Sequence, residues 1–145
     1  GVSPSPPGGG GGEVRVKERP GEALGTVVWD SSIVCSSVFV SLSGSDYVAG
    51  SSRVLDLSAG CGFFSLYMRE AHGAKVDATE VGRSLGLLRE NVAGARGPGP
   101  GGEPHPDVID LQWGDVVDGR RWDVVVVCDC LYDVGRLEKL RRTVE

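Results

Sequence analysis

The ten residues from Arg53 to Gly62 constrain the fold of this chain more than any other segment. Their sequence, RVLDLSAGCG, begins with an apolar run typical of a buried strand and ends with two glycines, Gly60 and Gly62. Glycine has no Cβ, so it lets the backbone turn tightly or approach a ligand closely. Residues 63–71 then carry apolar side chains at helical spacing, and His72-Gly73 is a typical helix end. A strand, a glycine turn and a helix form the first half of a nucleotide-binding βαβ unit.

Further strands and helices alternate after this unit. Strand patterns cover residues 74–80, 108–111 and 124–128, and helical patterns cover residues 84–92 and the last segment, which carries Leu137, Leu140 and Val144. The fourth strand, residues 124–128, is apolar throughout, as in a parallel strand that is covered on both faces. This alternation predicts an α/β fold with a parallel, doubly wound sheet, in which ligands bind at the carboxyl ends of the strands.

The segments that precede the first strand are less regular. Residues 1–12 are a Pro/Ser/Gly tract, which we expect to be a disordered tail, and the alternation in residues 13–18 predicts an exposed edge strand. Ile33, Val34, Val38 and Leu42 fall on one helical stripe, which predicts a helix with Asp30 or Ser31 as its N-cap and residues 43–46 as its end. The β-branched residues in this stretch also allow a strand.

Composition excludes several functional classes. The 145 residues suffice for one domain, and their formal charge of −5 argues against general binding to a nucleic-acid backbone. No apolar run approaches the roughly 20 residues that a membrane span needs, and we see no signal peptide. The four cysteines lack the spacing of a zinc site, which predicts no metal and reduced thiols. His105, flanked by prolines within the Gly/Pro-rich loop 94–106, is expected to be exposed.

Glu80 is the clearest candidate for ligand binding. It ends the second predicted strand, 24 residues after Asp56, and in dinucleotide-binding folds an acidic residue near this position binds the ribose hydroxyls. The alternative is an ordinary surface glutamate. At the same edge of the sheet we expect the glycine turn, Trp113 and residues 128–132.

Five blocks, taken in this order, resemble one protein family. They are Val27–Asp30, Val54–Gly62, Glu80, Leu111–Gly114 and Cys128–Asp133. Together they resemble the family 16 branch of the class I, seven-β-strand methyltransferases, of the methyltransferase-like 21 type. The resemblance covers about residues 25–140. It implies a Rossmann-like sheet with helices on both faces, S-adenosylmethionine as methyl donor and a protein lysine as acceptor, in the cytoplasm or also in the nucleus.

The resemblance also implies roles for particular residues. Its donor site comprises Trp29, Asp56, Ser58, Ala59, Gly60, Glu80, Trp113 and Cys128. Trp29 and Trp113 would flank the donor, residues 58–60 would line its methionine side, and Glu80 would hold the ribose. Asp129 and Tyr132 match the family's Asp-x-x-Tyr signature beside the target amine. The tryptophans could instead be core aromatics, and residues 129–132 an ordinary turn with a helix cap.

The chain departs from the family pattern at two small residues and at its end. The family usually has Gly where this chain has Ser58, and Ala or Gly at Cys128. Family members continue into further strands, so we expect residues 13–145 to form a C-terminally truncated methyltransferase domain with its fourth strand as a bare edge. Two alternatives remain, namely a non-catalytic domain that binds S-adenosylmethionine or a protein, and a nicotinamide-dependent enzyme. The lack of a full GxGxxG argues against the latter.

Overall fold

A computed structural model describes residues 14–42, 52–95, 102, 104–117 and 119–145. The predicted tail at 1–12 and the predicted helix end at 43–46 lie outside these residues. In chain order the elements are η1 (Leu24–Thr26), α1 (Asp30–Leu42), β1 (Arg53–Leu57), α2 (Phe63–His72), β2 (Lys75–Glu80), α3 (Gly82–Gly94), β3 (Val108–Asp110), β4 (Val124–Val127), η2 (Val134–Arg136) and α4 (Leu137–Val144).

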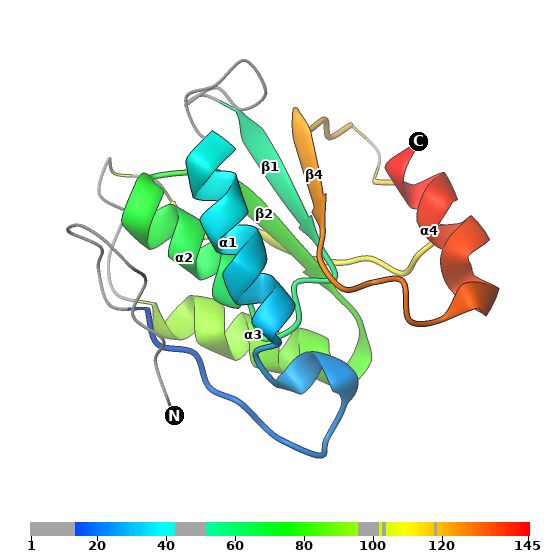
Figure 1. The fold of residues 1–145 in the computed structure, drawn as a ribbon, viewed down its shortest axis with the longest axis horizontal. Helices are drawn as coiled ribbons and strands as arrows, with labels where there is room; N and C mark the ends of the chain where they lie inside the picture. Colours follow the sequence, from blue (N-terminus) through cyan, green and yellow to red (C-terminus); the bar gives the residue numbers. More distant parts are fainter. Residues whose placement is uncertain (1–13, 43–51, 96–101, 103, 118) are drawn as a thin grey trace.

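The four strands form one parallel sheet in the order β3-β2-β1-β4 (Figure 1). Val54 of β1 pairs with Val76 of β2 on one side and with Val124 of β4 on the other. The predicted α/β class with a parallel sheet is therefore confirmed. The four strands predicted from Arg53 onward occupy their expected places, with ends that differ by one residue at most.

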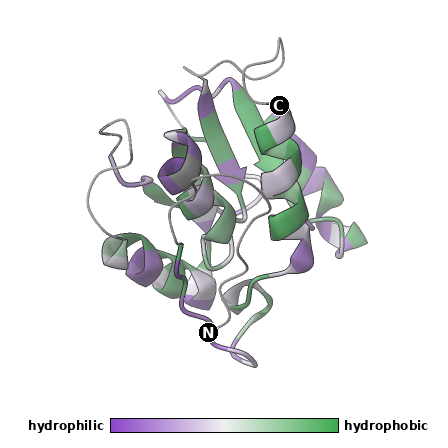
Figure 2. Ribbon diagram, turned by 60° about the vertical axis from the view of Figure 1, so that its left-hand side comes forward, coloured by the Kyte–Doolittle hydropathy of each residue, from purple (hydrophilic) through white to green (hydrophobic). Residues whose placement is uncertain are grey.

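Helices cover both faces of the sheet. Val54, Val76 and Val126 point to the face where Phe39 of α1 and Phe64 of α2 complete a cluster of buried side chains. Ala78 joins a second cluster on this face, with Leu88 and Val92 of α3. On the opposite face Leu57 packs with Leu111, Cys130 and Leu140 of α4. Because strand neighbours point to opposite faces, these sets alternate along each strand. Figure 2 shows hydrophobic residues both in the strands and along the helices that pack on them.

The predicted edge strand at residues 13–18 is wrong over its described part. Residues 14–19 form an extended arm with no strand pairing, which runs along α3. The Lys17 N–H donates to Asn91 Oδ1 at 2.8 Å, and Asn91 Nδ2 donates to the Lys17 carbonyl at 3.0 Å. The side-chain amide of Asn91 thus replaces a neighbouring strand. The apolar residues Val14 and Val16 pack beside α3 instead of against the sheet edge.

The helix predicted after Trp29 is confirmed as α1, but its buried face is not the predicted stripe. Val34 and Val38 are 61% and 51% exposed, whereas Phe39 is 6% exposed. The Phe39 ring meets the Phe64 ring edge-on, with centroids 5.5 Å apart. Helix α1 faces the core with Phe39, because burying this large aromatic side chain removes much apolar area from water and apolar stabilisation grows with that area. The hydroxyl of buried Ser36 donates to the Ser32 carbonyl, so this face needs no outside partner.

Strand β4 is the edge of the sheet, as expected, yet it is not covered on both faces. Val126 is 8% exposed, but Val125 and Val127 are each 38% exposed. Helix α4 reaches the sheet through Leu140, while Val144 remains 44% exposed. On the opposite face β4 is therefore only partly covered, whereas Leu55 and Leu57 of the neighbouring β1 are buried. Within the described residues, none of the helices has the length and apolar character to cross a membrane.

Candidate functional site

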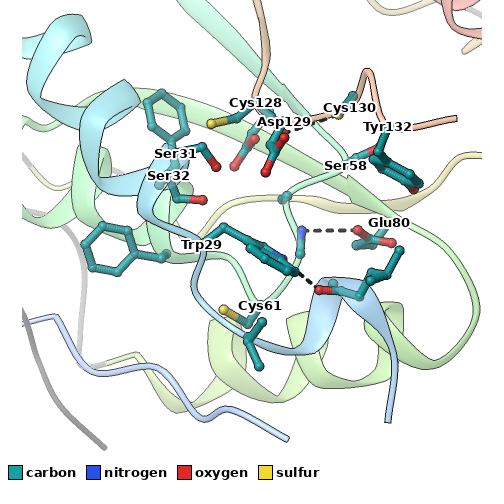
Figure 3. Close-up of a pocket in the computed structure, with 18 residues that line it drawn as sticks. Trp29, Ser31, Ser32, Ser58, Cys61, Glu80, Cys128, Asp129, Cys130 and Tyr132 are labelled. Carbon is teal, nitrogen blue, oxygen red and sulfur yellow. Dashed lines mark hydrogen bonds between the residues drawn. The ribbon is translucent and has the colours of Figure 1, made fainter. Parts of the chain in front are cut away.

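A cavity of about 300 Å³ opens at the carboxyl ends of β1, β2 and β4. Its wall comes from five places in the chain, namely the η1 segment, the start of α1, the β1–α2 turn, the end of β2 and the segment after β4 (Figure 3). The lining residues are Leu24, Gly25, Val27, Trp29, Ser31, Ser32, Asp56, Ser58, Ala59, Gly60, Cys61, Phe63, Phe64, Glu80, Cys128, Asp129, Cys130 and Tyr132.

The β1–α2 turn is shaped by left-handed backbone conformations. Gly60 and Gly62 have φ of 61° and 87°. A Cβ on Gly60 would lie 3.2 Å from the Gly25 carbonyl oxygen, and one on Gly62 would lie 2.6 Å from Leu88 Cδ1. The first glycine therefore lets the η1 segment approach the turn, and the second lets α3 pack beneath it. The left-handed φ of both glycines confirms the tight turn that the sequence predicts.

Glu80 holds the end of β2 against this turn. Its Oε1 accepts a hydrogen bond from the Gly60 N–H at 3.2 Å, and its Oε2 accepts one from the Val81 N–H at 2.8 Å. Burial raises the pKa of the Glu80 carboxyl, and these two hydrogen bonds oppose that rise. Each carboxylate oxygen has a second lone pair, so Glu80 can still accept hydrogen bonds from a ligand in the cavity.

Asp56 forms part of the cavity wall from within β1. The side chain is buried, and the Ser65 hydroxyl donates to its Oδ2 at 2.6 Å. Burial raises the pKa of Asp56 from 3.8 to about 7, while the Ser65 hydrogen bond opposes the rise and the charge of Glu80 adds to it. With this pKa the Asp56 carboxyl titrates near neutral pH, and it lies at the boundary between the cavity and the core.

The segment after β4 brings Asp129 and Tyr132 to the cavity. Asp129 has φ of 55°, a left-handed conformation that Asp tolerates better than most residues. The Cys130 thiol donates to the Leu57 carbonyl at 3.6 Å and anchors the segment to β1. In Figure 3 Asp129 lies near Ser31, and Tyr132 lies near Ser58. Burial raises the pKa of the Tyr132 hydroxyl, which stays protonated at neutral pH.

The two predicted tryptophans line different spaces. Trp29 lies in the main cavity, where its Nε1 donates to the Leu24 carbonyl at 2.8 Å. Trp113 lines a smaller cavity of about 140 Å³, which also contacts Ser58, Glu80 and Tyr132. The structure thus brings nine of the ten site residues predicted from sequence into the main cavity and places Trp113 in the adjoining one.

Several lining residues were not predicted. Ser31 was considered only as a helix cap, but its Oγ is buried in the cavity wall without a hydrogen-bond partner in the described part of the chain. Gly25 comes close to Ser84 and Glu80, and no motif in the sequence marks it. The signal that could have found Ser31 is its place directly after Asp30, the last residue of the first of the five blocks.

Trp122, the third tryptophan of the chain, lies outside both cavities, and its Nε1 donates to Asp77 Oδ2 at 2.7 Å. His105 is exposed, as expected. Across the described residues, no three His, Cys, Asp or Glu side chains are placed to hold a metal ion.

In a comparison with known families, a family model described as lysine methyltransferase matches residues 11–145 of the chain.

Proposed function

This chain belongs to the lysine methyltransferase family, and we propose that the main cavity is where its methyl donor and its target amine meet. Methyltransferases of this type use S-adenosylmethionine, and the acceptor is a protein lysine. What remains to be assigned is the site and the part that each residue plays in it. The observation that carries this assignment is the meeting of nine sequence-predicted residues around one cavity.

The residues of the cavity fit such a donor. A volume of about 300 Å³ is within the range of small-molecule pockets, which combine apolar walls with a few polar groups. Here the apolar wall includes Trp29, Phe63 and Phe64. The unpartnered Ser31 hydroxyl and the Glu80 carboxylate supply polar atoms that a ligand can satisfy. A buried hydroxyl without a partner in the described protein favours a bound polar group at that point.

We assign donor binding to the turn and to the residues around it. Glu80 would accept hydrogen bonds from the ribose hydroxyls, and Ser58, Ala59 and Gly60 would line the methionine side. Trp29 would cover the donor from the outer wall, where its ring is already fixed by the hydrogen bond to Leu24. When bound, S-adenosylmethionine supplies an electrophilic methyl group on a positively charged sulfur.

Asp129 and Tyr132 are the residues that we assign to the target amine. Methyl transfer requires a neutral amine held in line with the methyl group at near-attack distance. The Asp129 carboxylate can accept a hydrogen bond from the amine and so orient its lone pair, and the Tyr132 ring can form one wall of the lysine channel. Both residues line the main cavity at its edge and are exposed, so an incoming side chain can reach them.

The test of this assignment is Asp129→Ala. A cell lysate incubated with the protein and a methyl-labelled donor provides the acceptor, and the labelled acceptor then serves in a reconstituted assay. We expect methyl transfer to fall by roughly 100-fold, because the amine loses its orienting group, while calorimetric binding of S-adenosylhomocysteine is retained. Asp115→Ala, at an exposed carboxylate outside both cavities, is the matched control. Full methyl transfer by Asp129→Ala would contradict the assignment.

A second candidate function is donor binding without turnover. Intact binding of S-adenosylhomocysteine, together with no labelled acceptor in any lysate, would favour it.

We also propose that the protein works in the cytoplasm, since three thiols, those of Cys61, Cys128 and Cys130, line the cavity and a reducing compartment would keep them unmodified. Localisation of a tagged chain by microscopy tests this proposal.

A further inference from the structure

Ser58 stands at the boundary between the two cavities. It lines the main cavity and the smaller one. Its φ of 64° makes it one of two described non-glycine residues with a left-handed backbone, the other being Asp129. A glycine would adopt this conformation without strain, so a side chain at this position invites a physical explanation.

The Ser58 hydroxyl has a specific partner across the boundary. The Trp113 Nε1–H donates to Ser58 Oγ at 2.9 Å. Indole nitrogen is a donor only, so this bond satisfies the whole hydrogen-bonding capacity of the Trp113 side chain. The two residues come from different strand ends, because Ser58 follows β1 and Trp113 follows β3.

The backbone of Ser58 is fixed, which gives its hydroxyl a defined place. The Ser58 N–H donates to Thr79 Oγ1 at 3.0 Å, and the next N–H, that of Ala59, donates to the Thr79 carbonyl at 2.8 Å. Thr79 is itself buried in β2. The turn is therefore attached to the sheet on both sides of the Ser58 side chain, and only the χ1 angle of Ser58 remains free.

The Trp113 ring has fewer restraints without this bond. It packs at the edge of the cluster formed by Leu57, Leu111, Cys130 and Leu140, and it is only partly buried. Its aromatic neighbour Tyr132 lies at a ring-centroid distance of 6.3 Å with an interplanar angle of 49°, so the two rings are not stacked. The hydrogen bond to Ser58 is thus the directional contact that orients the indole plane.

We propose that Ser58 is a positioning residue, whose hydroxyl holds the Trp113 ring in place as a wall of the smaller cavity, beside the main one. This inference rests on the proposed function, because it treats the two cavities as parts of one donor site. A donor with a planar base and a polar tail would then meet a wall that is already in place, and less ordering would accompany binding. The proposal assigns to Ser58 an effect on donor affinity that acts through Trp113.

Two substitutions at Ser58 separate positioning from stability. Ser58→Gly and Ser58→Ala both remove the hydroxyl, but only alanine keeps a side chain in the left-handed conformation. We expect both variants to raise the calorimetric Kd of S-adenosylhomocysteine by the same factor, about fivefold, the worth of one neutral hydrogen bond. Their thermal midpoints should differ, with Ser58→Gly the higher of the two. If Kd follows the thermal midpoints instead, Ser58 has only a structural role and the proposal is wrong.

Trp113→Phe supplies the second arm, since phenylalanine keeps a ring and lacks the N–H donor. It should raise Kd on its own, and it should do so by a smaller factor in the Ser58→Ala background, because the hydrogen bond is already absent there. Equal factors in both backgrounds would overturn the proposal. Ser41→Ala, which removes an exposed hydroxyl outside both cavities, is the control for the loss of a serine and should leave Kd unchanged.

The outcomes also distinguish this inference from the proposed function. If the unaltered chain does not bind S-adenosylhomocysteine, the donor site itself is refuted. If it binds and neither Ser58 variant changes Kd, the role of Ser58 is refuted and the donor site stands. Should the Ser58 variants fail to fold, a Trp113→Phe protein with unchanged Kd would still overturn the inference.

Discussion

Replacing Asp56 by asparagine should change how the stability of this protein depends on pH. The folded-state pKa of Asp56 is raised from 3.8 to about 7, chiefly by burial. A carboxyl whose pKa is raised on folding stabilises the folded state fully below its unfolded pKa, and that stability is lost as pH rises through the folded pKa. A shift of this size corresponds to about 4 kcal/mol in all, of which about 3 kcal/mol is lost between pH 5 and pH 8.

Urea unfolding between pH 5 and pH 8, followed by circular dichroism, measures this loss. In Asp56→Asn the free energy of unfolding should fall by about 3 kcal/mol less over that interval than in the unaltered chain. The amide oxygen can still accept the Ser65 hydrogen bond, so the local packing is retained. In Ser65→Ala the free energy of unfolding should fall by more over this interval than in the unaltered chain. The substitution removes a hydrogen bond that lowers the pKa of Asp56, so the loss of stability extends to higher pH. Parallel pH curves for Asp56→Asn and the unaltered chain would refute the argument.

Two further predictions concern the elements around the turn. Asn91→Leu removes three hydrogen bonds, two to Lys17 and one to the Cys61 carbonyl, so it should destabilise the protein by about 3 kcal/mol and speed hydrogen exchange at the Lys17 amide. Glu90→Gln, which changes only an exposed ion pair beside Asn91, is the control and should leave the free energy of unfolding nearly unchanged. Gly62→Ala should cost about 2–3 kcal/mol in urea unfolding, because of its left-handed φ and its contact with Leu88, while Gly86→Ala, with open space around it, should stabilise α3 by up to about 1 kcal/mol.

The parts of the fold that the sequence predicted well are those in which one local pattern had no competitor. The β1 run leads directly into a glycine turn, and the helical pattern predicted at residues 84–92 forms α3, which buries its apolar residues Leu85, Leu88 and Val92. In both places the local conformation and the buried face agree. At α1 the helix itself was predicted but its buried face was not, because the valine stripe and Phe39 lie on different faces. The residue that decides which face is buried is Phe64, which packs on Phe39 and lies 25 residues further along the chain.

The arm at residues 14–19 shows a second limit of prediction from the sequence. Alternating side chains predict an extended backbone, which the arm has, but not the partner of that backbone. The partner is the side chain of Asn91, more than 70 residues away, and no period in the sequence reports it. For β4 the apolar run predicted burial, but coverage depends on what lies over each face, and Val125 and Val127 have little over them.

The candidate site was more predictable than these details, because a parallel sheet brings strand ends together by geometry alone. Glu80 ends β2 and Asp129 follows β4, on either side of β1, and both line the cavity although 49 residues separate them in the chain. What the strand-end rule could not supply is the outer wall. Gly25 and Ser31 reach the cavity because the segment from the arm to α1 folds over the turn, and that path is decided by tertiary contacts.

The pairing of β1 with β4 has a consequence for the order of folding. Val54 pairs with Val124, 70 positions later, whereas its pairing with Val76 spans only 22. Contacts between residues far apart in sequence form late, because the chain loses more entropy in closing the larger loop. Since Asp129 follows β4, the wall that carries it is completed only when the last strand docks. In a refolding experiment the recovery of methyl transfer should therefore coincide with the slowest structural phase and follow the appearance of helical signal.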